Sequence, residues 1–251
     1  MEMKEIRVCL LLTATIKPNT TDCGIFNVEE RKKHYIDSLN WYLANTPYKI
    51  VFCENSGTDL SELFTLNGGG ERIEFLTYKS KPVFPDRSKG YKEMEIIEYA
   101  VRNSKFLPQA EIIVKCTGRL VLLNINKIVH YLQRRNKKHF ISSWMSYSAL
   151  ISDSRFFFCS LDFLWHFVKY KESIDNHHIF EMNLAWAIRD KDRHTSFIYP
   201  NDNPHVHGIG SIGTVYDKQY ETTFKSRLVL LMKRFLFCLG YFPHTEAKVA
   251  C

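Results

Sequence analysis

The sequence has no apolar run of about 18 residues, the length that an ordinary transmembrane helix requires. Glycine and proline are scarce, with 11 and 8 among 251 residues, which excludes collagen-like and low-complexity architectures. The seven cysteines stand singly, without a C-x-x-C pair, and favour reduced thiols over a metal cluster or a disulfide framework. The apolar run from Val8 to Leu12 is too short for a signal-peptide core, so we expect a cytoplasmic chain.

Several enzyme motifs are missing as well. G-x-G-x-x-G and G-x-x-x-x-G-K-[S/T] are absent near the first expected strand, which argues against dinucleotide enzymes and ordinary P-loop kinases. Neither H-E-x-x-H nor G-x-S-x-G occurs, so a zinc protease or an α/β-hydrolase is not expected. Residues 208–213 (GIGSIG) resemble a phosphate loop, but this signal stands alone and is weak.

The composition is that of a soluble globular protein, with 45% hydrophobic, 24% charged and 14% aromatic residues. Its 34 Lys and Arg against 27 Asp and Glu give a formal net charge of +7. Residues 218–242 contain five of these cations and one acidic residue, a local charge of +4. This concentration predicts an anionic partner at that end, either a membrane surface or nucleic acid.

Strand-like and helix-like segments alternate through the first two thirds of the chain. Such alternation predicts an α/β fold with a mostly parallel central sheet, helices on both faces and a helical C-terminal portion. We expect strands at 6–15, 48–53, 72–78, 111–116, 139–144 and 149–159, and helices at 29–44, 61–64, 89–103, 126–135, 162–171 and 180–189.

Polar residues gather where these strands end. Ligands of such sheets bind at the carboxyl ends of the strands, and a cationic helix N-terminus there attracts phosphate. Each residue alone is compatible with a solvated loop side chain, so the prediction rests on their convergence at one edge. The predicted binding residues are Thr13, Ala14, Thr15, Glu54, Asn55, Lys89, Gly90, Lys115, Arg119 and Arg155, with Asp153 beside them.

The segments LLTATIKP, ENSG, SKGYKEMEIIEYA and IIVKCTGR resemble bacterial surface-polysaccharide (capsule or O-antigen) glycosyltransferases of the GT-A type, over roughly residues 6–190. The resemblance implies a catalytic domain at 1–217, with a nucleotide-sugar-binding half at 1–160 and an acceptor-side half at 161–217. It also implies a nucleotide diphosphate sugar donor, with a UDP-sugar favoured. Thr13, Ala14 and Thr15 would then lie near base and ribose, Glu54 and Asn55 near the nucleoside, and Lys89 near the diphosphate.

The sequence departs from the GT-A pattern where the fourth strand ends. An Asp-x-Asp motif usually stands there to hold a divalent cation, whereas this chain has Lys115 to Arg119. Two alternatives remain open. Lys and Arg side chains could neutralise the diphosphate, or Asp153 with His205 or His207 could hold Mn²⁺ or Mg²⁺. Asp153 could equally pair with Arg155.

Glycosyl transfer with inversion requires a carboxylate that deprotonates the acceptor hydroxyl. The segment 180–185 (FEMNLA) resembles the acidic-x-x-Leu element that supplies this base, which makes Glu181 the candidate, with Asp153 as a second catalytic residue. A helix-dipole contact in the first turn is the alternative role of Glu181. Inversion and retention of configuration both remain open.

The segment 218–251 is expected to form a basic, apolar tail. On a helical wheel of 224–242, Ser226, Arg227, Lys233 and Arg234 form a polar stripe that only Leu230 and Phe237 interrupt. This pattern fits an interfacial helix on anionic lipid at the inner face of the cytoplasmic membrane. A helix packed on the domain, or in a dimer, is the alternative.

The leading hypothesis is therefore an enzyme that transfers a hexose to a lipid-linked glycan in surface polysaccharide (capsule or lipopolysaccharide) synthesis. Because the Asp-x-Asp motif is missing, the alternative is a catalytically silent nucleotide- or glycan-binding module of a membrane-associated assembly. Nucleic acid is an unlikely partner, since the cations cluster at an apolar tail instead of an aromatic-studded groove.

Overall fold

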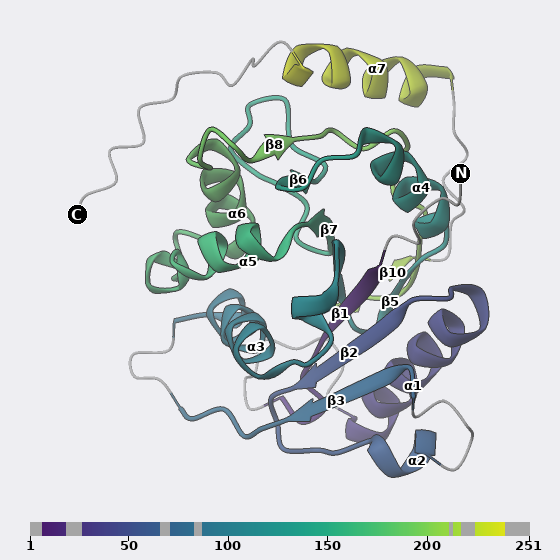
Figure 1. The fold of residues 1–251 in the computed structure, drawn as a ribbon. Helices are drawn as coiled ribbons and strands as arrows, with labels where there is room; N and C mark the ends of the chain where they lie inside the picture. Colours follow the sequence, from purple (N-terminus) through teal and green to yellow (C-terminus); the bar gives the residue numbers. More distant parts are fainter. Residues whose placement is uncertain are drawn as a thin grey trace.

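A computed structural model describes residues 7–18, 27–65, 71–82, 87–210, 213–216 and 224–238. Its main element is a seven-stranded sheet in the order β3-β2-β1-β4-β7-β6-β8 (Figure 1). The first four of these strands are parallel to one another, and they are β3 (Ile73–Thr77), β2 (Lys49–Glu54), β1 (Val8–Ala14) and β4 (Ile112–Thr117).

The other half of the sheet is mixed. β7 (Phe156–Cys159) runs antiparallel to both β4 and β6 (Phe140–Ser142), and β8 (Ser196–Phe197) is parallel to β6. Four of the six strand pairs are parallel, so the predicted α/β fold with a mostly parallel sheet is confirmed. The strand expected at 149–159 is much shorter, because the chain first turns back at a bridge between Met145 and Ser152.

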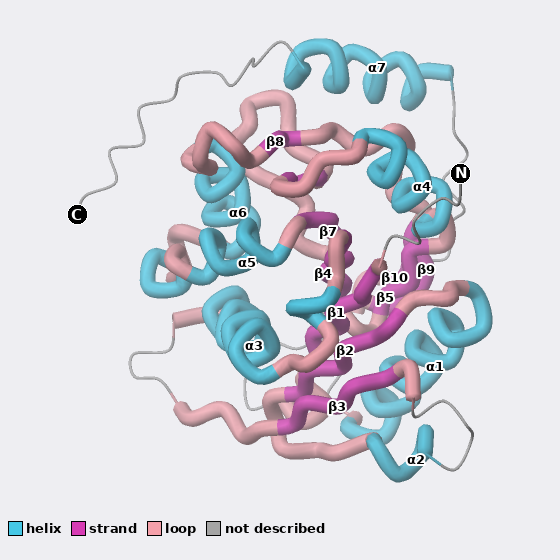
Figure 2. The backbone as a smooth tube through the Cα atoms, viewed as in Figure 1, coloured by secondary structure: helices cyan, strands magenta, loops and turns pink. Residues whose placement is uncertain are grey.

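The helices are α1 (Val28–Asn45), α2 (Ser61–Thr65), α3 (Lys89–Asn103), α4 (Ile125–Arg135), α5 (Leu161–Val168), α6 (Phe180–Arg189) and α7 (Phe224–Cys238). Two neighbours on β2 show that helices cover both faces, as expected. The Phe52 ring lies 5.8 Å from the Tyr35 ring of α1, whereas Cys53 Sγ donates to the Ile96 carbonyl of α3 at 3.5 Å. Figure 2 shows α1 and α3 on opposite sides of these strands.

A second, three-stranded antiparallel sheet was not predicted. It consists of β10 (Val215–Tyr216), β9 (Val206–Ile209) and β5 (Leu120–Leu122), in that order. Its strands are too short to show periodicity. Gly208 lies in β9 with φ +117°, and a Cβ there would be 2.5 Å from the carbonyl oxygen of Arg119. The first part of the GIGSIG segment is thus a strand, while residues 211 and 212 lie outside the described residues.

Four cysteines, Cys9, Cys53, Cys116 and Cys159, are buried and free. Burial raises the pKa of the Cys9 and Cys116 thiols to about 12. They pack as small hydrophobes, as the sequence predicted.

The second sheet is attached to α1 through Tyr42. The fully buried Tyr42 hydroxyl donates to the Leu120 carbonyl at 3.2 Å and accepts from the Leu122 amide at 3.1 Å. We predict that Tyr42→Phe lowers the free energy of unfolding by about 1–3 kcal/mol, because it removes the partner of the buried Leu122 amide and leaves the Leu120 carbonyl with Ser38 Oγ alone, at 3.4 Å. Urea denaturation measures this.

The control for that variant is Tyr48→Phe, at a half-buried residue whose hydroxyl makes no hydrogen bond to the described part of the chain. It should change the free energy of unfolding by less than about 0.5 kcal/mol. Equal effects of the two substitutions would contradict the role given to Tyr42.

Candidate active site

Glu54 ties together the loops that follow β1 and β2. Its side chain is fully buried and accepts the amides of Ile16, Ser56 and Thr58, each at 2.9 Å. A buried carboxylate is costly unless it is fully hydrogen-bonded, and these amides fulfil that condition. Glu54 therefore shapes the edge of the sheet, whatever contact it makes with a ligand.

Thr15 and Asn55 lie together just beyond the same two strands. Thr15 Oγ1 donates to Asn55 Oδ1 at 2.7 Å, and the Asn55 amide donates to the Ala14 carbonyl at 3.2 Å. From α1, Arg31 Nη2 donates to the Thr15 carbonyl at 2.6 Å, and the Tyr35 hydroxyl accepts from the Thr15 amide at 3.0 Å. The tips of β1 and β2 are thus held in one arrangement by side chains of α1.

Lys115 lies inside the site and not on its surface. Its side chain is fully buried, and its ammonium group pairs with Glu93 of α3 and donates to the Ser154 carbonyl at 2.6 Å. Glu93 also accepts from Thr13 Oγ1 at 3.1 Å. Lys115 and Thr13 therefore join β4 and β1 to α3, and the charge of Lys115 is already balanced.

Glu181 belongs to the same network. Ser154 Oγ donates to Glu181 Oε1 at 2.5 Å, and the Ser152 amide donates to the Glu181 carbonyl at 3.1 Å. The first turns of α3 and α6 touch, since a Cβ at Gly90 would lie 2.9 Å from Phe180 Cβ. The structure thus brings the predicted residues Gly90, Lys115 and Glu181 to one edge.

Arg119 is a buried charged residue at this edge, and no hydrogen-bonding partner for its guanidinium lies among the described residues. Within the described ranges neither Nε nor Nη1 of this side chain makes a hydrogen bond, and the guanidinium carbon lies 5.8 Å from the centre of the Tyr35 ring. The residue before it, Gly118, packs directly against β1 and α1: a Cβ there would lie 2.7 Å from the Thr13 carbonyl oxygen and 3.2 Å from the Tyr35 ring. A buried cation without an anion is unfavourable.

Asp153 and Arg155 form an ion pair. Asp153 Oδ2 accepts from Arg155 Nη2 at 2.7 Å, and Oδ1 accepts from both the amide and Nε of Arg155 at 3.0 Å. Burial opposes the charge of Arg155, but the hydrogen bonds and charge of Asp153 outweigh it and raise the pKa of Arg155. The pair precedes β7 instead of ending a strand, yet it reaches the same edge because β7 is antiparallel to β4.

The residues present do not fit the expected metal site. Both oxygens of Asp153 are engaged by Arg155, and His205 is held beside α4, where its amide donates to Asn124 Oδ1 at 3.1 Å. His207 is exposed on β9, opposite Val121. Within the described residues no group of three His, Cys, Asp or Glu side chains is placed to hold a metal ion. The divalent cation stays a prediction from the sequence that these contacts do not support, and no chemical step below depends on one.

Sequence reasoning missed four residues of this site: Glu93, Ser154, Tyr35 and Tyr216. The signal for Glu93 was available, since it lies one helical turn after Lys89 and so on the same face of α3. Tyr216 lies under the Arg155 guanidinium, with 5.0 Å between the guanidinium carbon and the ring centre. No sequence signal pointed to that contact, because it joins two different sheets.

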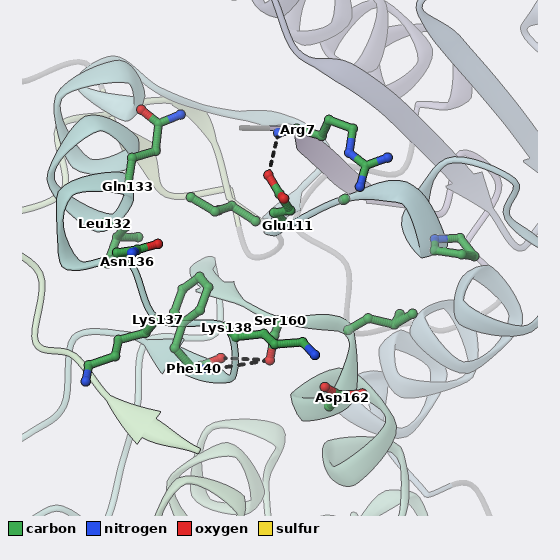
Figure 3. A pocket seen from close by; sticks show the side chains of 14 residues that line it. Arg7, Glu111, Leu132, Gln133, Asn136, Lys137, Lys138, Phe140, Ser160 and Asp162 are labelled. Carbon is green, nitrogen blue, oxygen red and sulfur yellow. Dashed lines mark hydrogen bonds between the residues drawn. The ribbon is translucent and has the colours of Figure 1, made fainter. Parts of the chain in front are cut away.

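A cavity of about 680 Å³ lies at the opposite, amino edge of the sheet (Figure 3). Arg7, Glu111, Lys138 and Ser160 are among its lining residues, and none of the predicted site residues is. Figure 3 shows the charged ends of Arg7 and Lys137 far apart in the view, with that of Lys138 between them.

No protein-family model and no curated protein sequence matches this chain. Its structure is similar to a candidate nucleotide-diphospho-sugar transferase from Desulfovibrio desulfuricans G20, at 13% identity and TM-score 0.48, over 94% of this chain and 99% of that one. It is also similar to the glycosyltransferase GlyE of Streptococcus pneumoniae TIGR4 (8% identity, TM-score 0.46, 94% and 52% covered). A cytidylyltransferase from Leptospira borgpetersenii is a third similar structure (11%, 0.46, 96% and 99%). At these values the similarity says nothing about the reaction.

The pairing of Lys115 with Glu93 yields a test of the site's internal electrostatics. We predict that Glu93→Gln lowers the free energy of unfolding by about 2–4 kcal/mol, because it leaves a fully buried ammonium group without its carboxylate. The double variant Glu93→Gln/Lys115→Met should recover at least half of that loss. Chemical denaturation of the two variants and of Lys115→Met completes the cycle, and strictly additive effects would rule out the pairing.

Proposed function

We propose that this chain is a glycosyltransferase that moves a hexose from a nucleotide diphosphate sugar, with a UDP-sugar favoured, to a glycan acceptor. The observation that carries the proposal is the buried guanidinium of Arg119 at the carboxyl edge of the sheet, whose Nε and Nη1 have no hydrogen-bonding partner in the part of the chain that the structure describes. A diphosphate supplies both the missing negative charge and the missing acceptor atoms. The neighbouring cations Lys115 and Arg155 are already paired.

The donor is expected to lie across the tips of β1 and β2. Thr13, Ala14 and Thr15 would bound base and ribose, and Glu54 and Asn55 would hold the loop that carries the nucleoside. Lys89 and Gly90, at the start of α3, would approach the diphosphate, where the N-terminus of a helix favours negative charge. Arg119 would bind the same group from the α1 side.

Glu181 is the proposed general base. Its Oε1 accepts from Ser154, while Oε2 makes no hydrogen bond to the described part of the chain and is available for an acceptor hydroxyl. In the transfer, the acceptor oxygen attacks the anomeric carbon, the bond from that carbon to the diphosphate breaks, and the acceptor proton moves to Glu181. Arg119 then stabilises the charge left on the departing diphosphate.

The finer features extend this proposal. The acceptor would be a lipid-linked glycan, and the reaction would take place at the inner face of the cytoplasmic membrane. The product would be used in surface polysaccharide synthesis. Asp153 would act through Arg155, holding that guanidinium beside the donor.

A second candidate function is a catalytically silent module that binds a nucleotide or a glycan. The ion pair of Asp153 with Arg155 favours it, because this pair withdraws a carboxylate from chemistry. A panel of UDP-, GDP- and TDP-sugars separates the two functions: binding without turnover supports the silent module, and absence of both contradicts both.

Arg119 should contribute to binding and not to stability. We predict that Arg119→Met weakens binding of the matching nucleoside diphosphate by about 10- to 150-fold, the loss of one or two charge-assisted hydrogen bonds. Without nucleotide, the variant should be at least as stable as the parent, since it removes an unpaired buried charge. Calorimetric titration and thermal unfolding measure the two effects.

The matched control is Arg102→Ala, which removes an exposed arginine paired with Glu98 on the outer part of α3. It should leave nucleotide binding unchanged. If Arg119→Met binds nucleotide as tightly as the parent, the diphosphate does not lie at Arg119.

Substitution at Glu181 should separate chemistry from binding. We predict that Glu181→Gln reduces kcat by about 10²- to 10⁴-fold, the usual contribution of a general base, with an unchanged donor Kd. Steady-state kinetics and titration with donor test this. A variant that retains more than a third of kcat would remove Glu181 from the mechanism.

Removal of divalent cations tests whether a metal ion, instead of arginine side chains, neutralises the charge of the diphosphate. Because Asp153 is engaged by Arg155 and Arg119 is unpaired, we expect turnover to persist in excess EDTA. Loss of activity in EDTA, with recovery on adding Mn²⁺ or Mg²⁺, would restore the cation to the site.

A further inference from the structure

The C-terminal helix α7 packs on the β8 end of the main sheet, far from α2 at the other end (Figure 1). Its inward face carries Leu230 and Phe237, both buried, and the Phe237 ring stacks on that of Tyr199 at 5.3 Å. Two of its cations also turn inward. Lys233 Nζ donates to the Met145 carbonyl at 3.0 Å, and Arg234 Nη2 donates to the Tyr131 hydroxyl at 3.4 Å.

This packing reverses the usual orientation of a surface helix. The inward face is largely the polar stripe expected from the helical wheel, whereas the outward face is apolar. Leu228, Leu231, Met232 and Phe235 are 49%, 57%, 51% and 65% exposed. Their spacing of three, four and seven residues places them in one row. We call this row the outer ridge.

The surroundings of the outer ridge indicate what covers it. At 100° per residue, Lys225 and Arg227 lie on either side of the ridge near the start of α7, and both are exposed. The helix has no acidic residue. Beside it, Tyr147 and Ile151 are 48% and 46% exposed, and Lys233 lies 4.6 Å from the Tyr147 ring centre.

We infer that the outer ridge of α7 docks this protein on an anionic lipid bilayer, with Leu228, Leu231, Met232 and Phe235 among the acyl chains and Lys225 and Arg227 at the headgroups. Apolar side chains flanked by cations suit that surface, and an aromatic ring at its border suits the interface. No described helix is both long and apolar enough to cross a membrane, so α7 lies on the bilayer instead of spanning it.

The inference extends the proposed function, because a lipid-linked acceptor would be presented at the same surface. Ile151 lies two residues before Asp153, and two residues of extended chain span at most about 7 Å. A bilayer in contact with Ile151 would therefore lie close to the ion pair of Asp153 with Arg155. The docking surface itself depends on no catalytic residue. It can therefore be tested without donor or acceptor.

The experiment is co-sedimentation of the full chain with vesicles of phosphatidylcholine and phosphatidylglycerol, compared with vesicles of phosphatidylcholine alone. Leu231→Ser/Phe235→Ser should lower the partition coefficient at least about tenfold. Lys225→Gln/Arg227→Gln should lower it about fivefold per charge on the mixed vesicles and hardly at all on the neutral ones. Circular dichroism and thermal unfolding confirm that each variant is folded.

Two controls are matched to these variants. Leu63→Ser removes a similarly exposed leucine, 43% exposed, from α2 at the far end of the sheet, and should leave vesicle binding unchanged. Arg234→Gln removes an inward cation of α7 and should also have no effect on vesicle binding. A loss with either control equal to that of the ridge variants would overturn the proposal.

Sedimentation velocity without vesicles distinguishes a second copy of the chain from a bilayer. If the parent is a dimer that Leu231→Ser/Phe235→Ser converts to a monomer, the ridge is a subunit interface and the inference is wrong. Equal binding of the parent to both vesicle types, or to neither, also overturns it. Turnover of a soluble donor is measured separately, so failure of the docking surface leaves the proposed reaction standing, and the reverse also holds.

Discussion

The carboxyl edge of the sheet depends on one buried ion pair. Lys115 stands in the strand next to β1 with no exposed side-chain surface, and an ammonium group in that position is tolerable only with a carboxylate and further hydrogen bonds. Glu93 provides the carboxylate from α3, and the Ser154 carbonyl provides an acceptor from the loop before β7. Ser154 in turn holds Glu181. The proposed base is therefore positioned by a chain of contacts that begins at a lysine with no proposed contact to substrate.

Three of the cations at this edge, Lys115, Arg155 and Arg119, differ in whether an acidic side chain balances them. Lys115 is balanced by Glu93 and Arg155 by Asp153, so the charge of each already has a partner within the protein. Arg119 lies outside both pairs, where Gly118 turns the chain out of β4 and past Tyr35. The protein thus carries an unfavourable buried charge at one position, and such positions are commonly functional because a ligand relieves them.

Two features of the molecule, Arg119 and the outer ridge of α7, each lack the partner that their chemistry requires. Arg119 is a buried polar group without a partner, and the outer ridge of α7 is an apolar row without a cover. Both are departures from what folding alone would favour. A diphosphate at the first and a lipid surface at the second would each supply the missing partner.

Much of the architecture followed from the sequence. Apolar runs predicted β1, β2 and β4, apolar–polar alternation predicted β3, and helical patterns predicted α1, α3, α4 and α6 within one or two residues at each end, because these signals are local. The short strands β5, β8, β9 and β10 carry too few residues to show a period. β5, β9 and β10 pair with one another and β8 pairs with the three-residue β6, so their positions depend on how the surrounding chain packs.

The sequence by itself determined which polar residues end the strands, because a strand's end is set by its own apolar run. Only the tertiary structure decided how those residues pair. Lys115 meets Glu93 across 22 positions, Ser154 meets Glu181 across 27, and Lys233 meets Met145 across 88. Each pairing depends on how helices and loops pack over the sheet. That packing left Arg119 without a hydrogen-bonding partner among the described residues and turned Lys233 and Arg234 of the polar stripe inward. A side chain's neighbours are fixed by the whole fold and not by its place in the chain.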